Sequence, residues 1–181
     1  VRTAPAPARP AWLLGEALAE QRLWQLSSDA PYPPVICAPQ TVAELRCTRG
    51  TSDVWEPLLD LRRPVLLSMQ TPEKFTAAAL VVAFDGNSAW VATADGMERL
   101  PLVALASAWR GGYAYLWRPT EGWQQPLGVG DSGAAVAAVA RWFATLDGQD
   151  TPLTIDRFTD ALAARVTLFQ ESVGLTADGV V

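Results

Sequence analysis

Residues 78–100 read AALVVAFDGNSAWVATADGMERL, and this stretch decides the fold of the larger part of the 181-residue chain. Three segments within it, residues 78–84, 88–93 and 97–100, have the length and side-chain pattern of β-strands. The turns between them read DGN and ADG. Each turn contains a glycine, which can take the positive φ that tight hairpins need. The stretch therefore predicts three consecutive antiparallel strands.

The flanking sequence predicts an α+β unit around these strands. Two further strand patterns lie at Val65–Met69 and Tyr113–Trp117. Short hairpin-linked strands with helices before and between them favour an antiparallel sheet covered by helices. The helical patterns that we expect in this unit lie at residues 11–27, 39–45, 52–61 and 101–109, the last ended by Gly111 and Gly112.

A second, smaller unit is indicated by a change of pattern near residue 119. Residues 120–126 are polar and contain proline and glycine, as is typical of a domain boundary. Beyond them we expect one helix over residues 133–146, capped by Asp131 or the serine after it. A second helix is expected between Thr159, as its N-cap, and Gly174, as its C′ residue. A helical unit of about 55 residues has only a marginally stable hydrophobic core.

Composition excludes several classes of function. Lys and Arg number 14 against 19 Asp and Glu, and the pI is near 4.7, so binding to nucleic acid is disfavoured because the phosphates would be repelled. The chain contains no histidine, which excludes Ser-His and Cys-His catalytic pairs and His-ligated zinc. It also lacks a Gly-rich phosphate loop. We therefore expect a binding or structural role with no metal and no cofactor.

The N-terminal segment indicates that the chain is part of a longer protein. Residues 1–10, VRTAPAPARP, form a Pro- and Ala-rich leader with the composition of an extended linker. The sequence opens on Val1 rather than Met and has no signal peptide. Its longest apolar run, Ala77–Phe84, is far shorter than the roughly 20 residues that a membrane helix needs.

Cys37 and Cys47 are the only two cysteines. Their spacing and the lack of further Cys or His ligands argue against a metal site. Neither thiol has a histidine to activate it as a nucleophile. A disulfide and a pair of buried reduced thiols remain. We favour the disulfide, which requires an oxidising compartment and which, by loop entropy, contributes roughly 2–3 kcal/mol.

Three elements of the second unit resemble a known family. They are LGVGDSGAAV at residues 127–136, Phe-Gln at 169–170 and GLTADG at 174–179. Together they resemble the type 1 peptidoglycan-binding domain family, with its Leu-x-x-Gly-x-x-Gly-x-x-Val opening. The resemblance implies a small three-helix domain over residues 127–181, truncated at its C-terminus because the sequence stops before the third helix. It also implies a peptidoglycan-binding surface, for which the candidate residues are Arg165, Gln170, Asp178 and Gly179.

The first unit carries a fainter resemblance in the segments LRRPVLL at 61–67, AAALVVAFDG at 77–86 and WRGGY at 109–113. These are similar to the latter half of the C39 family of papain-like peptidases. In that family a histidine begins the second segment, an aspartate follows on the next strand, and a cysteine begins the first long helix. The matching positions here are Ala77, then Thr93 or Ala94, and the cysteine-free stretch Trp12–Gly15. The resemblance implies an inactive, papain-like domain over residues 11–119, with no catalytic residues.

The two resemblances, in this order, are those of the periplasmic region of the general secretion pathway protein A family of type II secretion. This likeness covers residues 11–181. It implies a non-enzymatic periplasmic region of a single-pass inner-membrane protein of a Gram-negative bacterium, preceded by a cytoplasmic ATPase domain. The implied partners are peptidoglycan, general secretion pathway protein B and, indirectly, the secretin whose assembly through the wall the complex helps. The full-length complex is expected to contain several copies of this protein.

Two other functions remain open at the level of sequence. The helical unit could lack wall affinity and serve oligomerisation or another protein interaction. Alternatively, the chain could belong to a cell-wall hydrolase, which would need carboxylate chemistry in the absence of histidine. The acidic candidates Asp85 and Asp95 both precede glycine in predicted turns, a position that turn formation alone explains.

Overall fold

Residues 78–100 form three consecutive antiparallel strands in a computed structural model of the chain, which confirms the central prediction. The strands are β3 (Thr76–Asp85), β4 (Ser88–Ala92) and β5 (Met97–Pro101). Gly86, in the first turn, has a φ of 57°, as that turn requires. The structure describes residues 9–37, 45–120, 122–123 and 126–181. The chain divides into two units, Val1–Arg118 (unit 1) and Pro119–Val181 (unit 2).

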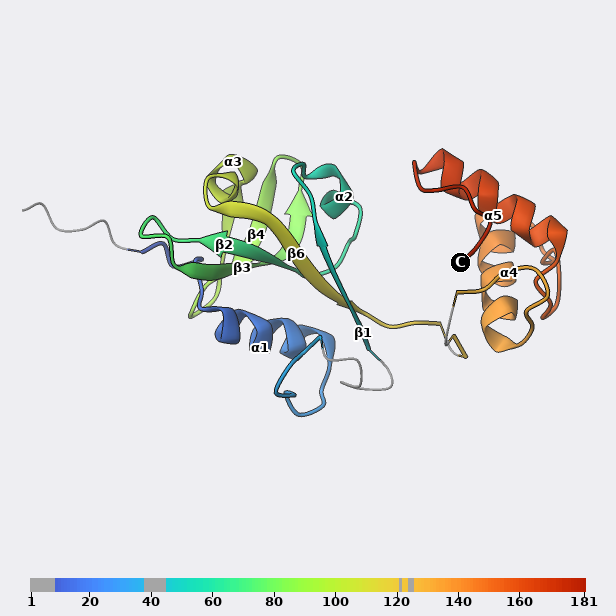
Figure 1. The fold of residues 1–181 in the computed structure, drawn as a ribbon, viewed down its shortest axis with the longest axis horizontal. Coiled ribbons are helices and arrows are strands. Elements are labelled where there is room, and N and C mark those ends of the chain that lie inside the picture. The colour runs from blue at the N-terminus through green and yellow to red at the C-terminus, as the bar shows by residue number, and fades with distance from the viewer. Residues whose placement is uncertain (1–8, 38–44, 121, 124–125) are drawn as a thin grey trace, which may run out of the picture. The chain divides into compact units, whose positions relative to one another are not determined.

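Unit 1 is built on a six-stranded sheet in the order β1-β6-β2-β3-β4-β5, with every neighbouring pair antiparallel (Figure 1). The other strands are β1 (Arg46–Thr51), β2 (Val65–Gln70) and β6 (Trp109–Trp117). The sheet and its helices confirm the α+β class. The sequence did not predict β1, because its residues RCTRGT show no apolar pattern.

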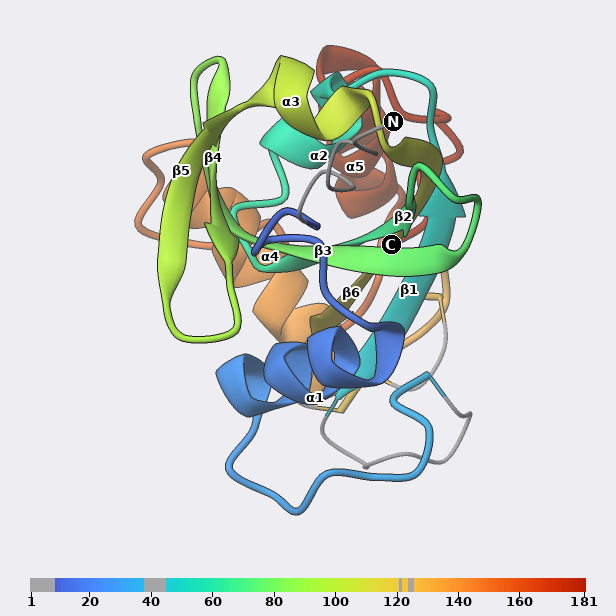
Figure 2. The ribbon, with the colours of Figure 1, turned by 90° about the vertical axis from the view of Figure 1, so that its left-hand side faces the viewer.

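Helix α1 (Glu16–Ser27) covers one face of the sheet, and α2 and α3 cover the other (Figure 2). On the α1 side, Leu23 and Trp24 are buried in one cluster with Leu80 of β3. Successive residues of a strand point to opposite faces, so a central strand with apolar residues at consecutive positions needs cover on both sides.

The opposite face carries two short helices, α2 (Glu56–Leu59) and α3 (Leu102–Ala106). Leu58 and Leu105 are fully buried there in the main core of unit 1. Both helices are shorter than the predicted spans, residues 52–61 and 101–109. The predicted helix at residues 39–45 lies almost entirely outside the described residues, as does most of the leader.

The predicted helix over residues 11–27 begins only at Glu16, because the residues before it join the sheet. The N–H of Leu14 donates to the carbonyl oxygen of Ala78 at 2.8 Å, and the N–H of Ala78 donates to that of Leu14 at 2.9 Å. This antiparallel bridge fixes the start of α1 beside β3. A helical rhythm in the sequence does not reveal such a long-range pairing.

The prediction that Gly111 and Gly112 end a helix is wrong, because both lie within β6. At Gly112 a Cβ would come within 2.7 Å of the hydroxyl oxygen of Ser68 on the neighbouring strand. Gly111 has a φ of 80°, and a Cβ there would come within 2.9 Å of the carbonyl oxygen of Ser52. The two glycines therefore allow close approach between strands, a common reason for glycine inside a sheet.

The described part of unit 2 contains two helices, α4 (Ala134–Leu146) and α5 (Asp160–Ser172). The hydroxyl of Thr159 accepts the N–H of Leu162 at 3.3 Å, so Thr159 is the predicted N-cap of α5. Gly174 follows the C-cap residue with a φ of 72°, the conformation expected at C′. Both predictions for this helix are confirmed.

The predicted cap of α4 is wrong. Its N-cap is Gly133, which has a φ of 125° and no side chain to cap the helix. Asp131 instead accepts the backbone N–H of Gly128 at 2.8 Å and so closes the loop before the helix. The side chains at the core of unit 2 are buried between α4, α5 and the loops that precede them: Leu127, Val136, Phe143, Phe158, Leu162 and Val166.

A first prediction concerns Gly50 of β1, which lies opposite Tyr113 of β6. A Cβ at Gly50 would come 2.5 Å from the tip of the Tyr113 ring, which stacks on Tyr115. We expect Gly50→Ala to lower the free energy of unfolding of unit 1 by about 1–3 kcal/mol, because the ring must leave its position. Denaturant unfolding followed by tryptophan fluorescence measures the change.

Gly96 provides the matched control, because a Cβ there meets nothing within 4 Å. Gly96→Ala should leave the free energy of unfolding within about 0.5 kcal/mol of the wild-type value. Equal losses in the two variants would show that crowding by Tyr113 is not the cause.

Candidate functional site

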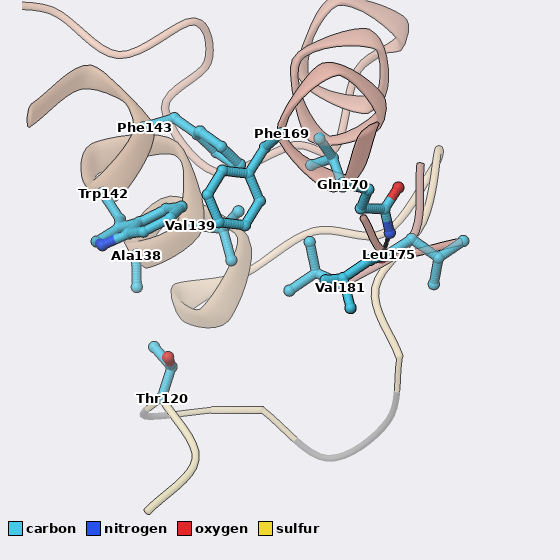
Figure 3. Close-up of a pocket in the computed structure, with 11 residues that line it drawn as sticks. Thr120, Ala138, Val139, Trp142, Phe143, Phe169, Gln170, Leu175 and Val181 are labelled. Atoms are coloured by element: carbon cyan, nitrogen blue, oxygen red, sulfur yellow. Dashed lines mark hydrogen bonds between the residues drawn. The ribbon is translucent and has the colours of Figure 1, made fainter. Parts of the chain in front are cut away.

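Unit 2 carries a groove of about 550 Å³ along α4 and α5 (Figure 3). Positions 138, 139, 142 and 143 of α4 recur at helical spacing on one face, and positions 166, 169 and 170 do so on α5. The lining is almost entirely apolar and contains no charged side chain among the described residues: Thr120, Ala138, Val139, Trp142, Phe143, Val166, Phe169, Gln170, Leu175, Val180 and Val181.

Three aromatic rings form one wall of the groove. Trp142 meets Phe143 and Phe169 edge to face, with ring centroids 4.8 and 5.2 Å apart, and the two Phe rings are 5.8 Å apart. This mutual packing holds the rings in fixed orientations. The Trp142 side chain nevertheless remains 49% exposed, which leaves a large aromatic surface open to solvent.

Gln170 holds the C-terminal segment of unit 2 against α5. Its side-chain nitrogen donates to Oδ1 of Asp178 at 2.8 Å and to the carbonyl oxygen of Val180 at 2.9 Å. Its side-chain oxygen accepts the N–H of Gly179 at 2.9 Å. The side chain is only 8% exposed, and both of its amide hydrogens and its oxygen are used within the protein.

The same contacts affect the acidity of Asp178. Its carboxylate accepts hydrogen bonds from the N–H of Val180 and from the side-chain amide of Gln170. These bonds, the one from Val180 being the larger cause, hold the pKa of Asp178 below its ordinary value. A second link ties down the chain end, because the N–H and carbonyl of Val181 pair with those of Leu127 at 3.0 and 2.7 Å. The end of the described chain therefore forms a fixed wall of the groove.

Arg165 makes a separate set of contacts. Its guanidinium donates to both carboxylate oxygens of Asp147, at 2.8 and 2.6 Å, and lies 4.7 Å from the centre of the Phe143 ring. Hydrogen bonding to Arg165 is the main reason that the pKa of Asp147 is lowered. Of the four residues predicted to contact peptidoglycan, the structure brings together Gln170, Asp178 and Gly179 and places Arg165 in a different contact. Their role as ligand contacts stays a prediction.

Trp142 is the residue of this site that sequence analysis missed. It lies three residues after Val139 and next to Phe143, so it falls at the edge of the apolar face of α4. A tryptophan in that position is compatible with core packing as well as with exposure. Only the arrangement of α4 against α5 shows that its ring remains open.

The charges of the chain are unevenly divided. Unit 2 contains eight acidic and three basic residues, whereas unit 1 contains eleven of each. The net charge of −5 is therefore carried by unit 2 alone. A unit with a net negative charge disfavours anionic ligands and favours neutral or cationic ones.

Two of the positions that the C39 resemblance matched to catalytic residues, Ala77 and the stretch Trp12–Gly15, lie side by side in unit 1. Ala77 is buried in β3 and shares the main core with Trp12 and Leu13. The next residues along both segments, Leu14 and Ala78, form the bridge described above. The structure thus brings together the helix start and the strand start that the resemblance singled out.

Comparisons with known proteins were made at three levels. No family model and no curated protein matches the sequence. The chain is similar in structure to a periplasmic domain of the EpsAB fusion protein of the Vibrio vulnificus type II secretion system, with a TM-score of 0.67 and 23% identity. That match covers 94% of this chain and 75% of the other, and it shows that the two share one fold.

A weaker likeness concerns the N-terminal peptidase C39-like domain of the toxin secretion ATP-binding protein from Vibrio parahaemolyticus. The TM-score is 0.38 at 17% identity, over 61% of this chain and 99% of the other, which is too low to support an inference. Among the described residues, no helix combines the length and the apolar character needed to span a membrane.

A second prediction tests the role of Gln170. Gln170→Glu replaces the donating nitrogen by an oxygen that faces the Asp178 carboxylate and the Val180 carbonyl. We expect the free energy of unfolding of unit 2 to fall by about 2–4 kcal/mol at neutral pH, because two hydrogen bonds are lost and two acceptors are forced together. The new carboxyl group should have a raised pKa, so the loss should shrink as the pH falls through that value.

Denaturant unfolding followed by circular dichroism at neutral and acidic pH measures this effect. Gln149→Glu is the control, since Gln149 is exposed and its side-chain nitrogen donates to the Asp147 carbonyl at the long distance of 3.5 Å. A Gln170→Glu variant as stable as the control at neutral pH would show that the amide does not hold the C-terminal segment.

A third prediction follows from the lowered pKa of Asp147. A carboxyl group whose pKa is lower in the folded state stabilises the fold above its unfolded-state pKa, and this contribution is lost as the pH falls through the folded-state value. Asp147→Asn should therefore make the stability of unit 2 fall less steeply on acidification. Thermal unfolding across the acidic range measures the slope, and Asp150→Asn, in the same loop, is the control. Identical slopes in both variants would contradict the assignment.

Proposed function

We propose that the chain is a periplasmic, non-enzymatic wall-binding and scaffolding region of a type II secretion protein with the architecture of general secretion pathway protein A. The observation that carries the proposal is the likeness to the V. vulnificus periplasmic domain, which at 94% coverage extends over both units. The sequence elements that resemble the type 1 peptidoglycan-binding family all lie in unit 2. Fold and motifs therefore support the same assignment from independent directions.

Unit 1 acts in this proposal as an inactive C39-like domain that makes protein contacts. The absence of histidine and the apolar residues Ala77 and Trp12 at the corresponding positions support the lack of peptidase activity. General secretion pathway protein B is the proposed partner, and assembly of the secretin through the cell wall is the process that the complex serves. A membrane anchor and a cytoplasmic ATPase domain would belong to the full-length protein.

Unit 2 provides the wall-binding surface. Trp142 offers an exposed ring on which the apolar face of a sugar can stack, and Asp178 lies in the segment that forms another wall of the groove. The sugars of the glycan strand of peptidoglycan are uncharged when their peptide stems are attached, which fits a groove lined by uncharged side chains.

The apolar lining of the groove also favours a second candidate function. An exposed apolar surface of this kind is a common feature of protein interfaces, so unit 2 could serve oligomerisation without wall affinity. Light scattering with and without protein B distinguishes a self-associating module from a monomer. A cell-wall hydrolase is the least supported candidate, and zymography on wall substrate tests it.

A fourth prediction tests wall binding by cosedimentation with purified peptidoglycan sacculi. The 181-residue chain should pellet with the sacculi, and Trp142→Ala should weaken binding about tenfold, because a central aromatic contact contributes on the order of 1–2 kcal/mol. Trp90→Ala is the matched control, since Trp90 is 41% exposed and lies in unit 1. It should bind as the wild type does.

A version of the chain extended beyond Val181 completes the experiment. If only the extended version pellets, the third helix that the family resemblance implies is needed for binding and the 181-residue chain alone is not sufficient. If neither version pellets, peptidoglycan binding is excluded and the interaction module becomes the better description. Equal losses in the two tryptophan variants would place the binding surface outside the groove.

A further inference from the structure

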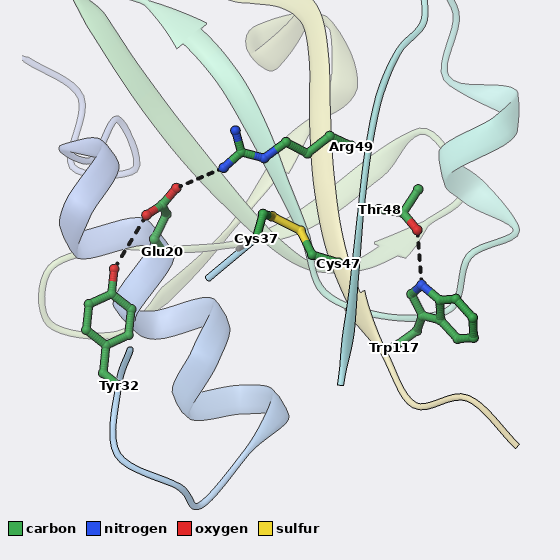
Figure 4. Close-up of a disulfide and its surroundings, with 7 residues drawn as sticks. All are labelled: Glu20, Tyr32, Cys37, Cys47, Thr48, Arg49 and Trp117. Carbon is green, nitrogen blue, oxygen red and sulfur yellow. Dashed lines mark hydrogen bonds and ion pairs between the residues drawn. A yellow bond between two sulfur atoms is a disulfide. The ribbon is translucent and has the colours of Figure 1, made fainter. Parts of the chain in front are cut away.

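The disulfide between Cys37 and Cys47 joins the segment after α1 to the edge of the sheet (Figure 4). Cys47 is the second residue of β1, and β1 is the last strand in the order β1-β6-β2-β3-β4-β5. Within the described part of the chain, β1 pairs with β6 alone. The disulfide is therefore attached to a strand that only one neighbour holds in place.

The side chains of β1 anchor it weakly. Cys47 is the one apolar side chain in its sequence RCTRGT. Arg49 lies 3.7 Å from Glu20, but the two side chains are 61% and 24% exposed, and such an exposed pair contributes little. A further side-chain contact is a hydrogen bond of 3.0 Å from the Trp117 indole to the Thr48 hydroxyl. By contrast, β2 on the other side of β6 buries three apolar residues.

The two ends of β1 are held by different means. At its C-terminal end, the N–H of Ser52 donates to the carbonyl oxygen of Gly111 at 2.9 Å, and Trp55 stacks on Trp109 with ring centroids 4.3 Å apart. At its N-terminal end, Leu45 and both cysteines pack in the cluster beneath α1. Only the N-terminal end depends on the disulfide.

Removal of β1 would uncover the strand best suited to pair with another chain. Residues Gly112–Trp117 of β6 oppose Thr51–Arg46 in unbroken register. This segment, GYAYLW, is aromatic and uncharged. A long apolar edge of this kind is a template for strand pairing. The other edge strand, β5, carries Glu98, Arg99 and Pro101, which are typical devices that block such pairing.

We propose that the Cys37–Cys47 disulfide is a latch that keeps β1 on the edge of β6. A dithiol reductant transfers two electrons and two protons to the disulfide and is itself oxidised to a disulfide, which leaves Cys37 and Cys47 as thiols. The N-terminal end of β1 then loses its covalent restraint and opens before the rest of unit 1. The exposed β6 edge pairs with the β6 edge of a second copy of the chain.

Hydrogen exchange on the intact 181-residue protein tests the latch. We compare the oxidised chain with Cys37→Ser/Cys47→Ser. Backbone amides that join β1 to β6 should exchange about tenfold faster or more in the variant relative to those of β3 (Thr76–Asp85). Light scattering should show association that increases with concentration in the variant and not in the oxidised chain.

A matched control separates local opening from general destabilisation. Val91→Ala removes buried volume from β4, far from the disulfide in the strand order, and leaves the latch intact. It should accelerate exchange in β1 and β3 together and should not cause association. If the double-serine variant does not fold, pulse labelling of folded protein after reduction and alkylation gives the same comparison.

Two results would overturn the proposal. If the amides of β1 and β3 accelerate in parallel in the reduced or double-serine protein, the disulfide is a general staple and not a latch on one strand. If β1 opens selectively but the protein remains monomeric at all concentrations, the exposed β6 edge is not a pairing site.

Discussion

Unit 1 depends on one constraint, namely that the central strands carry apolar side chains on both faces. In β3, five consecutive residues from Ala77 to Val81 are buried, so neither face of the sheet can be left to solvent. Helix α1 covers one side, and α2 and α3 cover the other. The residues before α1 pair with β3 through Leu14 and so place α1 beside that strand. The short helices α2 and α3 cover one face of the sheet, and the two disulfide-bonded cysteines pack in the cluster on the α1 face.

Unit 2 is stabilised differently, because a unit of its size gains too little stability from apolar burial alone. Its described core is one cluster between α4 and α5. The side-chain amide of Gln170 adds hydrogen bonds that hold the C-terminal segment against α5. Three hydrogen bonds of the Gln170 side chain hold the segment that ends at Val181. The pKa of Asp178 is lowered chiefly by the N–H of Val180 and then by the one Gln170 bond that reaches its carboxylate.

Much of the fold was predictable because its determinants are local. The hairpins of residues 78–100 and the caps of α5 are determined by the residues of the turns and caps themselves, and the sequence predicted them. Strand β1 was not predicted because it forms by pairing with β6, whose partner residues lie more than sixty positions later in the sequence. Gly112 was misread for the same reason, since Ser68 on a neighbouring strand decides its role.

The candidate site shows the same division between local and long-range information. The motif around Gln170 pointed to the correct region, but its burial arises only when residues 178–180 fold back onto α5. Likewise, the exposure of the Trp142 ring depends on where α5 packs against α4 and not on the sequence of α4 alone.

The bridge between Leu14 and Ala78 carries a mechanical consequence. Tension applied through Pro10 reaches the fourth strand of six rather than an edge, so two backbone hydrogen bonds and the buried Trp12 ring bear the load at the centre of the sheet.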